Sequence, residues 1–156
     1  GAKVGGGWEL NIKLLNGKDL VAKDTVVSGD YGTTFTQSSD PYVVFTIGNA
    51  SVKSKTIEKT LEPEWNEELS LSVQDRMQRL EMEVFDQDVA DEDDSMGKAS
   101  ISLVDLVEGK PKMVTARLKG YEPGSGGKAT EESMGEVSVV LTLQPSKGKV
   151  DAAVLR

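Results

Sequence analysis

The stretch RLEMEVFDQDVADEDDSMG, residues 79–97, contains the two patterns that decide the fold of this chain. In residues 79–85 apolar and charged side chains alternate, and this period of two predicts a strand with one buried face. Positions 86–94, which we call the acidic loop, then hold six carboxylates without a lysine or arginine. A solvated loop is the simplest interpretation of such a run. However, carboxylates that leave a rigid strand together repel one another unless a cation joins them, and calcium takes several oxygen ligands at once.

Seven further runs show the same alternation, and turn residues separate them. They are residues 8–14, 42–47, 52–57, 68–73, 99–104, 113–118 and 136–143. No segment carries a convincing apolar stripe of helical period, although residues 103–107 could form one helical turn. Eight strands without crossover helices predict an all-β, antiparallel sandwich or barrel. Residues 119–134, which are rich in glycine, are expected to be a mobile loop.

The composition narrows the class of protein. The chain has 156 residues, which predicts one domain, and it contains neither Cys nor His. Ser-His and Cys-His nucleophiles are therefore excluded, and the lack of Cys is compatible with a reducing compartment. A net charge of −8 without a basic cluster argues against nucleic acid as the partner. No run is long and apolar enough for a transmembrane helix, and residues 1–7 are interpreted as a linker or a remnant of cloning.

Four motifs fall in the same order as in a known family. They are LVAKD at 20–24, SDPYVVF at 39–45, TLEPEWNEE at 60–68, and VFDQD at 84–88 with its trailing DDSMG. These motifs resemble the C2 domain, the calcium- and phospholipid-binding module of conventional protein kinase C and the synaptotagmins. The resemblance implies an eight-stranded antiparallel β-sandwich over residues 8–144, followed by a tail or linker at 145–156. Because residues 8–14 lead directly into the first motif and a strand is left over at 136–143, the permuted type II topology, as in the phospholipases, is also expected.

The resemblance further implies a calcium site built from two loops. Its side-chain ligands would be Asp24, Asp40, Asp86, Asp88 and Asp94, and its backbone ligands the carbonyls of Lys23 and Gln87. Asp91 falls where the family often has a ligand for an additional ion, whereas Glu92 and Asp93 are expected to be solvated. An EF-hand is excluded, because a loop counted from Asp86 has Asp91 at its sixth position and Gly97 at its twelfth, where an EF-hand needs Gly and Glu.

The first of these loops is longer than usual, since fifteen residues separate Asp24 from Asp40. The extra residues could displace Asp24, so that Asp30 would serve in its place. Alternatively, the apolar residues of the insertion form a longer tip beside an intact calcium site, which we favour because LVAKD matches the family well. These apolar residues are Val26, Val27, Tyr31 and Phe35. A third alternative is a disordered insertion without a role.

The expected function is calcium-dependent, peripheral binding to anionic phospholipid, with phosphatidylserine as the expected lipid. The apolar tips, including Val89 in the acidic loop, would contact the membrane. Lys53 and Lys55 match lysines that bind phosphoinositide in the protein kinase C type, but Gln87 and Val44 replace an aromatic residue and a lysine of the members with that site. The domain is expected to be cytoplasmic, recruited to membranes by calcium, monomeric in isolation and part of a larger protein.

Two other classes of function compete with membrane binding. A calcium-independent protein-interaction domain uses the same scaffold, but such domains typically lose several loop aspartates that this chain retains. A carboxylate-based enzyme such as a glycosidase needs an acid and a nucleophile across a substrate cleft, and no pattern in the sequence places one. The chain is therefore expected not to be an enzyme.

Overall fold

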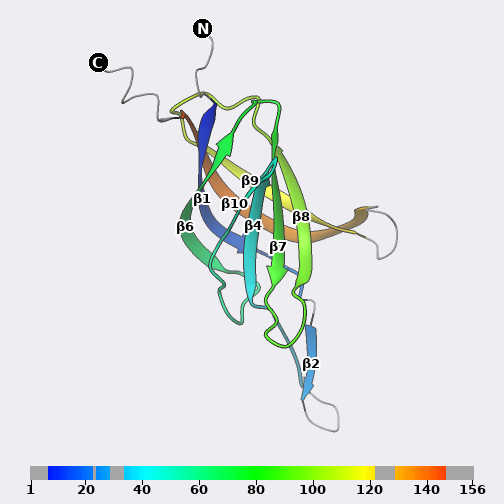
Figure 1. The fold of residues 1–156 in the computed structure, drawn as a ribbon. Helices are drawn as coiled ribbons and strands as arrows, with labels where there is room; N and C mark the ends of the chain where they lie inside the picture. Colours follow the sequence, from blue (N-terminus) through cyan, green and yellow to red (C-terminus); the bar gives the residue numbers. More distant parts are fainter. Residues whose placement is uncertain (1–6, 23, 29–33, 122–128, 147–156) are drawn as a thin grey trace, which may run out of the picture.

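The computed structural model describes residues 7–22, 24–28, 34–121 and 129–146, in which the regular elements are strands. They are β1 (Trp8–Lys18), β2 (Asp24–Ser28), β3 (Thr34–Ser38), β4 (Pro41–Ile47), β5 (Ala50–Lys53), β6 (Glu64–Val73), β7 (Arg79–Asp86), β8 (Asp94–Ser102), β9 (Lys112–Tyr121) and β10 (Ala129–Pro145). The predicted all-β, antiparallel fold is confirmed, and Figure 1 shows its arrangement. No helix in this described part of the chain is long and apolar enough to cross a membrane.

Eight of the strands form one antiparallel ladder in the order β5-β4-β7-β8-β9-β10-β1-β6. Within the described residues, β8 and β9 are joined at a single residue pair, Lys98 with Lys119, whereas β7 and β8 share a long register. The ladder therefore consists of two four-stranded halves, β5-β4-β7-β8 and β9-β10-β1-β6, which enclose the core (Figure 1). The final strand β10 lies between β9 and β1. The assignment of this order to the type II topology stays a prediction.

Alternating apolar side chains from both halves fill the space between them. Phe45 of β4, Leu80, Met82 and Val84 of β7, and Leu10, Ile12 and Leu14 of β1 are at most 1% exposed. Arg79 and Glu81, which alternate with the buried residues of β7, are exposed. Each large apolar side chain buried in this way contributes about 1.5–3 kcal/mol to folding. The alternation in residues 79–85 thus correctly indicated which face of β7 is buried.

Several elements differ from those predicted. β9 runs to Tyr121 and β10 begins at Ala129, so the expected mobile loop over residues 119–134 is wrong at both of its ends, while residues 122–128 lie outside the described residues. The possible helical turn at residues 103–107 is a reverse turn, in which Leu106 N donates to Leu103 O at 3.3 Å. Pairing of the two strands explains the first difference, because antiparallel pairing of β9 with β10 supplies hydrogen bonds that a free loop would lack.

The insertion between the first two predicted ligands forms a separate antiparallel ribbon, β2 with β3. Asp24 pairs with Ser38 at the base of the ribbon, and Ser28 pairs with Thr34 farther out. Figure 1 shows that the ribbon projects from the end of the sandwich where β7 is followed by β8. The insertion therefore closes on itself, and its two ends return to paired positions.

Candidate functional site

Three of the predicted ligands lie at the ends of three neighbouring strands. Asp86 is the last residue of β7, Asp94 is the first residue of β8, and Asp40 immediately precedes β4. In the ladder, Asp86 lies opposite Pro41 on one side and Asp94 on the other. Neighbouring strands are about 5 Å apart. Strand pairing thus brings the backbones of these three residues to one edge of the sandwich.

Asp40 and Asp86 are fixed by hydrogen bonds as well as by pairing. Asp86 is 3% exposed, and its Oδ1 accepts a hydrogen bond from Asp40 N at 2.9 Å. Gln87 N donates to Asp40 O at 2.9 Å, which continues the contact beyond the end of β7. Asp40 Oδ1 in turn accepts from Lys59 N at 2.7 Å. A buried carboxylate of this kind needs such partners, because burial without them would cost several kcal/mol.

The ribbon determines where the fourth ligand lies. Because Asp24 pairs with Ser38, its backbone lies opposite a residue that is two positions from Asp40. A long insertion therefore does not carry Asp24 away from Asp40 along the chain. The interpretation of the insertion as a longer apolar tip beside an intact calcium site stays a prediction. Lys23 and Asp30, the predicted backbone ligand and the alternative to Asp24, lie outside the described residues.

The carboxylates of the acidic loop differ in their exposure and in their hydrogen-bond partners. Asp88 Oδ1 accepts from Ala90 N at 2.9 Å, and Asp91 and Glu92 are exposed. Asp93 was expected to be solvated; it is partly exposed, and both of its carboxylate oxygens also accept hydrogen bonds from the protein. Its Oδ1 accepts from Asp88 N at 2.8 Å, and its Oδ2 accepts from the hydroxyl of Tyr42 on β4. Spacing along the sequence could not distinguish Asp93 from Glu92, because the contact with Tyr42 joins residues 51 positions apart.

The contact between Tyr42 and Asp93 changes the acidity of both groups. Burial raises the pKa of Tyr42 to about 12, and the hydrogen bond to Asp93 adds to the effect, as do the charges of Asp93 and Glu83. The pKa of Asp93 lies below its usual value, because the N–H of Asp88 and the Tyr42 hydroxyl stabilise the carboxylate, with a smaller attraction from Lys53. Both shifts favour the same state, a neutral Tyr42 bound to an ionised Asp93.

We expect one of the three tyrosines to ionise late in an alkaline titration followed by the ultraviolet absorbance of tyrosinate. Since the pKa of folded Tyr42 exceeds the ordinary value of 10.0, its contribution to stability is complete below pH 10 and is lost as the pH rises towards 12. Conversely, the contribution of Asp93 is lost as the pH falls through its lowered pKa. Tyr42→Phe should remove the late step and the control Tyr121→Phe should keep it; a late step that persists in Tyr42→Phe would contradict the assignment.

The donor set at this end fits a hard cation. Carboxylate oxygens predominate, and the chain has no His or Cys, so calcium is a better match than zinc. Within the described residues, Oδ2 of Asp40 and Oδ2 of Asp88 accept no hydrogen bond, which leaves each an available oxygen. No three carboxylates among those same residues converge as a ready-made metal site. These residues therefore suit calcium by the type of their donor atoms and by their position at the strand ends. In this structure Asp40 and Asp88 each accept a hydrogen bond from a nearby backbone N–H group.

The structure describes some of the residues predicted to contact lipid and leaves others outside its described part. Val89 is 98% exposed at the tip of the acidic loop. Lys53 is exposed and ends β5, with its Nζ 5.2 Å from the ring centre of Tyr42. Lys55 is also exposed, but β5 ends at Lys53, so the prediction that both lysines lie on one strand is wrong. The backbone N of Lys55 donates a hydrogen bond to Glu67 Oε1. Tyr31 and the side chains of Val26, Val27 and Phe35 lie outside the described part of the structure.

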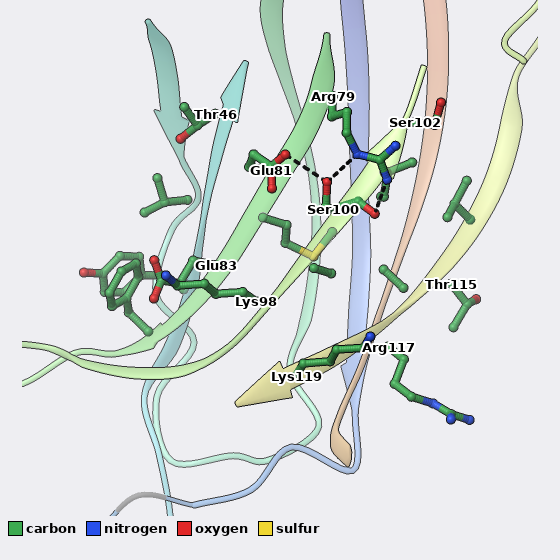
Figure 2. Close-up of a pocket in the computed structure, with 18 residues that line it drawn as sticks. Thr46, Arg79, Glu81, Glu83, Lys98, Ser100, Ser102, Thr115, Arg117 and Lys119 are labelled. Carbon is green, nitrogen blue, oxygen red and sulfur yellow. Dashed lines mark hydrogen bonds between the residues drawn. The ribbon is translucent and has the colours of Figure 1, made fainter. Parts of the chain in front are cut away.

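A groove follows the outer face of β4, β7, β8 and β9, and Tyr42 is among the residues that line it (Figure 2). Arg79 Nε donates to Ser100 Oγ at 2.7 Å, and Ser100 Oγ donates to Glu81 Oε2 at 2.8 Å. Figure 2 shows these three side chains joined across β7 and β8. Because these polar groups are satisfied within the protein, we place the candidate site at the acidic loop and its neighbouring strand ends.

Comparison with known sequences finds relatives over most of the chain. The family model of the C2 domain matches residues 8–118. Protein C2-DOMAIN ABA-RELATED 11 of Arabidopsis thaliana is 39% identical over 121 residues, which cover 78% of this chain and 63% of that protein. A multiple C2 and transmembrane domain-containing protein of Drosophila melanogaster is 34% identical over 139 residues, or 88% of this chain and 14% of that protein. The chain therefore spans less than two thirds of the length of these curated relatives.

Solved structures resemble the fold over most of the chain. The C2A domain of plant extended synaptotagmin 1 superimposes with a TM-score of 0.71 and 26% identity, covering 91% of this chain and 97% of that one. The calcium-bound C2A and C2B domains of extended synaptotagmin 2 give a TM-score of 0.66 and 29% identity, covering 88% and 45%. These likenesses concern the fold as a whole, so the assignment of the site depends on the residues described above.

Proposed function

The chain belongs to the C2 domain family, and from this premise we propose that it is a calcium-dependent, peripheral membrane-binding module. The observation that carries the proposal is that strand pairing brings the backbones of Asp40, Asp86 and Asp94 together at the ends of three neighbouring strands. A relative that contains several C2 domains and a transmembrane domain, and a calcium-bound structural neighbour, support both parts of the proposal.

The residues that would hold calcium come from both loops. They are Asp24, Asp40, Asp86, Asp88 and Asp94, the backbone carbonyls of Lys23 and Gln87, and Asp91 for an additional ion, with Asp30 as the alternative to Asp24. When bound, calcium supplies positive charge and coordination positions that lipid phosphate oxygens can complete. Partly open sites of this kind bind calcium weakly without lipid, with dissociation constants on the order of 10⁻⁵ to 10⁻³ M.

The charge of the acidic loop provides the switch. Without a cation, the six carboxylates make this loop strongly negative in a chain whose net charge is −8, so the loop repels anionic lipid. Asp86 and Asp94 are held by strand pairing, so neutralising them requires no change of fold. Val89, which is exposed at the tip, then lies where it can enter the headgroup region. A cytoplasmic domain of this kind, monomeric by itself and part of a larger protein, would move to anionic membranes when calcium rises.

Co-sedimentation with vesicles tests the proposal. The chain should sediment with phosphatidylcholine vesicles that contain phosphatidylserine when calcium is present, and binding should fall at least about 10-fold in chelator, since each charge near an anionic surface is worth about 1 kcal/mol. Vesicles of phosphatidylcholine alone are the matched control. Equal binding in calcium and in chelator would overturn the proposal and favour the calcium-independent alternative. Adding phosphoinositide to the vesicles tests whether Lys53 and Lys55 contribute.

We also propose a binding module in preference to an enzyme. The groove contains two glutamates, Glu81 and Glu83, but Glu81 accepts a hydrogen bond from Ser100, which is itself bonded to Arg79. The Glu81 carboxylate is therefore engaged by Ser100 within the protein, whereas a general acid must reach the substrate. Release of sugar from glycoside substrates in a hydrolysis assay would contradict this part of the proposal.

A further inference from the structure

We propose that Asp93 is a positioning residue, which fixes the acidic loop on β4 and thereby holds the predicted ligand Asp88 in place. The inference rests on the proposed function, because it assigns Asp93 a role in calcium binding. It differs from the expectation drawn from spacing, in which Asp93 is solvated and has no role. The geometry of two hydrogen bonds carries the inference.

The two carboxylate oxygens of Asp93 have different partners. Oδ1 accepts from the backbone N of Asp88 at 2.8 Å, and Oδ2 accepts from the hydroxyl of Tyr42. One carboxylate therefore joins the middle of the acidic loop to a strand of the sandwich. Both oxygens are already engaged within the protein, so Asp93 could become a ligand only by giving up these bonds.

The far end of this connection is rigid. Tyr42 is 8% exposed on β4, and its ring stacks on that of Phe85 with 5.5 Å between centroids. The Nζ of Lys53 lies 5.2 Å from the ring centre of Tyr42, over its face. A buried, stacked ring has little rotational freedom, so its hydroxyl is a fixed point for the loop. Tyr42 therefore transmits the rigidity of β4 to Asp93.

The near end of the connection acts on Asp88. Asp93 holds the backbone N of Asp88, while Asp88 Oδ1 accepts from Ala90 N at 2.9 Å. The Asp88 backbone and side chain are thus both constrained, and the backbone constraint comes from Asp93. Substitution of a residue that orients a metal ligand in this indirect way typically lowers the metal affinity about 10- to 100-fold.

Four single variants separate positioning from charge. Asp93→Asn keeps a carbonyl oxygen for Asp88 N and places an amide beside the Tyr42 hydroxyl, which can then accept. Asp93→Ala removes both bonds. Glu92→Gln and Glu92→Ala make the matched changes at the adjacent residue, which is exposed. Circular dichroism melts of each variant establish that it is folded before calcium binding is measured by calorimetry.

We expect Asp93→Ala to weaken calcium binding about 10- to 100-fold. Asp93→Asn and Glu92→Gln should each weaken it by roughly 2- to 3-fold, the effect of one nearby charge in a solvated site. Rescue by Asn is the decisive result, because a ligand or a purely electrostatic role would make Asn as damaging as Ala. Equal losses for Asp93→Asn and Asp93→Ala, or an Asp93→Ala variant that behaves like Glu92→Ala, would overturn the inference alone. Absence of calcium binding by the unmodified chain would overturn the proposed function and this inference with it.

Discussion

The double variant Asp86→Asn with Asp88→Asn is expected to lose calcium-dependent sedimentation with phosphatidylserine vesicles. Each change replaces a charged ligand by a neutral amide, and we expect the calcium affinity to fall by at least about 100-fold, since two unit charges next to the ion are removed. Asn at position 86 can still accept the hydrogen bond that Asp86 Oδ1 receives from Asp40 N. The fold should therefore survive, which a thermal melt of the variant would verify.

The matched control places the same loss of charge at the other end of the sandwich. Glu9→Gln with Asp105→Asn also removes two negative charges, from β1 and from the turn after β8, where both side chains are exposed. This control should retain the full calcium response. A full response in Asp86→Asn with Asp88→Asn would show that the calcium site lies elsewhere, whereas an equal loss in both double variants would indicate an effect of net charge alone.

Gly135→Ala is expected to lower the free energy of unfolding by about 2–4 kcal/mol, from a left-handed backbone and a steric clash together. Gly135 has a φ of +95°, and a Cβ at this position would lie 2.5 Å from Asp19 O and 2.7 Å from Lys18 O. The neighbours are backbone atoms at the end of β1, so they cannot rotate away as a side chain would. Urea unfolding at equilibrium measures the effect.

Gly109→Ala is the control for this effect. Gly109 has a similar φ of +79°, but among the described residues, apart from its own neighbours in the chain, no heavy atom lies within 4 Å of the position that a Cβ would take. Its substitution should cost about 1 kcal/mol, the left-handed backbone alone. The difference between the losses of unfolding free energy in the two variants measures the cost of the clash between β10 and the end of β1. Equal losses in the two variants would contradict the clash. Because the chain continues from Asp19 towards Asp24, Gly135→Ala should also weaken calcium binding.

The sandwich strands could be predicted because each has a buried and an exposed face. Alternation in residues 79–85 and 8–14 records that asymmetry directly, and the structure has strands there. The β2–β3 ribbon could not be predicted in this way. The ribbon is a two-stranded sheet of its own that projects from the sandwich, so the alternation that marks the sandwich strands was no guide to it. The pairing of Asp24 with Ser38 depends on chain closure and not on local sequence.

The part of the candidate site that lies at the ends of predicted strands could be predicted from the sequence. Asp40 and Asp86 are next to alternating runs, so strand pairing brings them together once the fold is known. The role of Asp93 depends on a tertiary hydrogen bond to Tyr42, which no local pattern records. The available signal was the motif SDPYVVF itself, which places a tyrosine two residues after a predicted ligand, on a strand that continues into the core.

The single pair that joins β8 to β9 has a mechanical consequence. Asp40, Asp86 and Asp94 belong to the half made of β5-β4-β7-β8, whereas Asp24 follows β1 of the other half. Strand pairing between the halves is limited, within the described residues, to the Lys98 and Lys119 pair of β8 and β9. An ion held by aspartates from both halves would act as a cross-link between them. The domain would then resist being pulled apart most strongly when it is loaded with calcium and attached to a membrane.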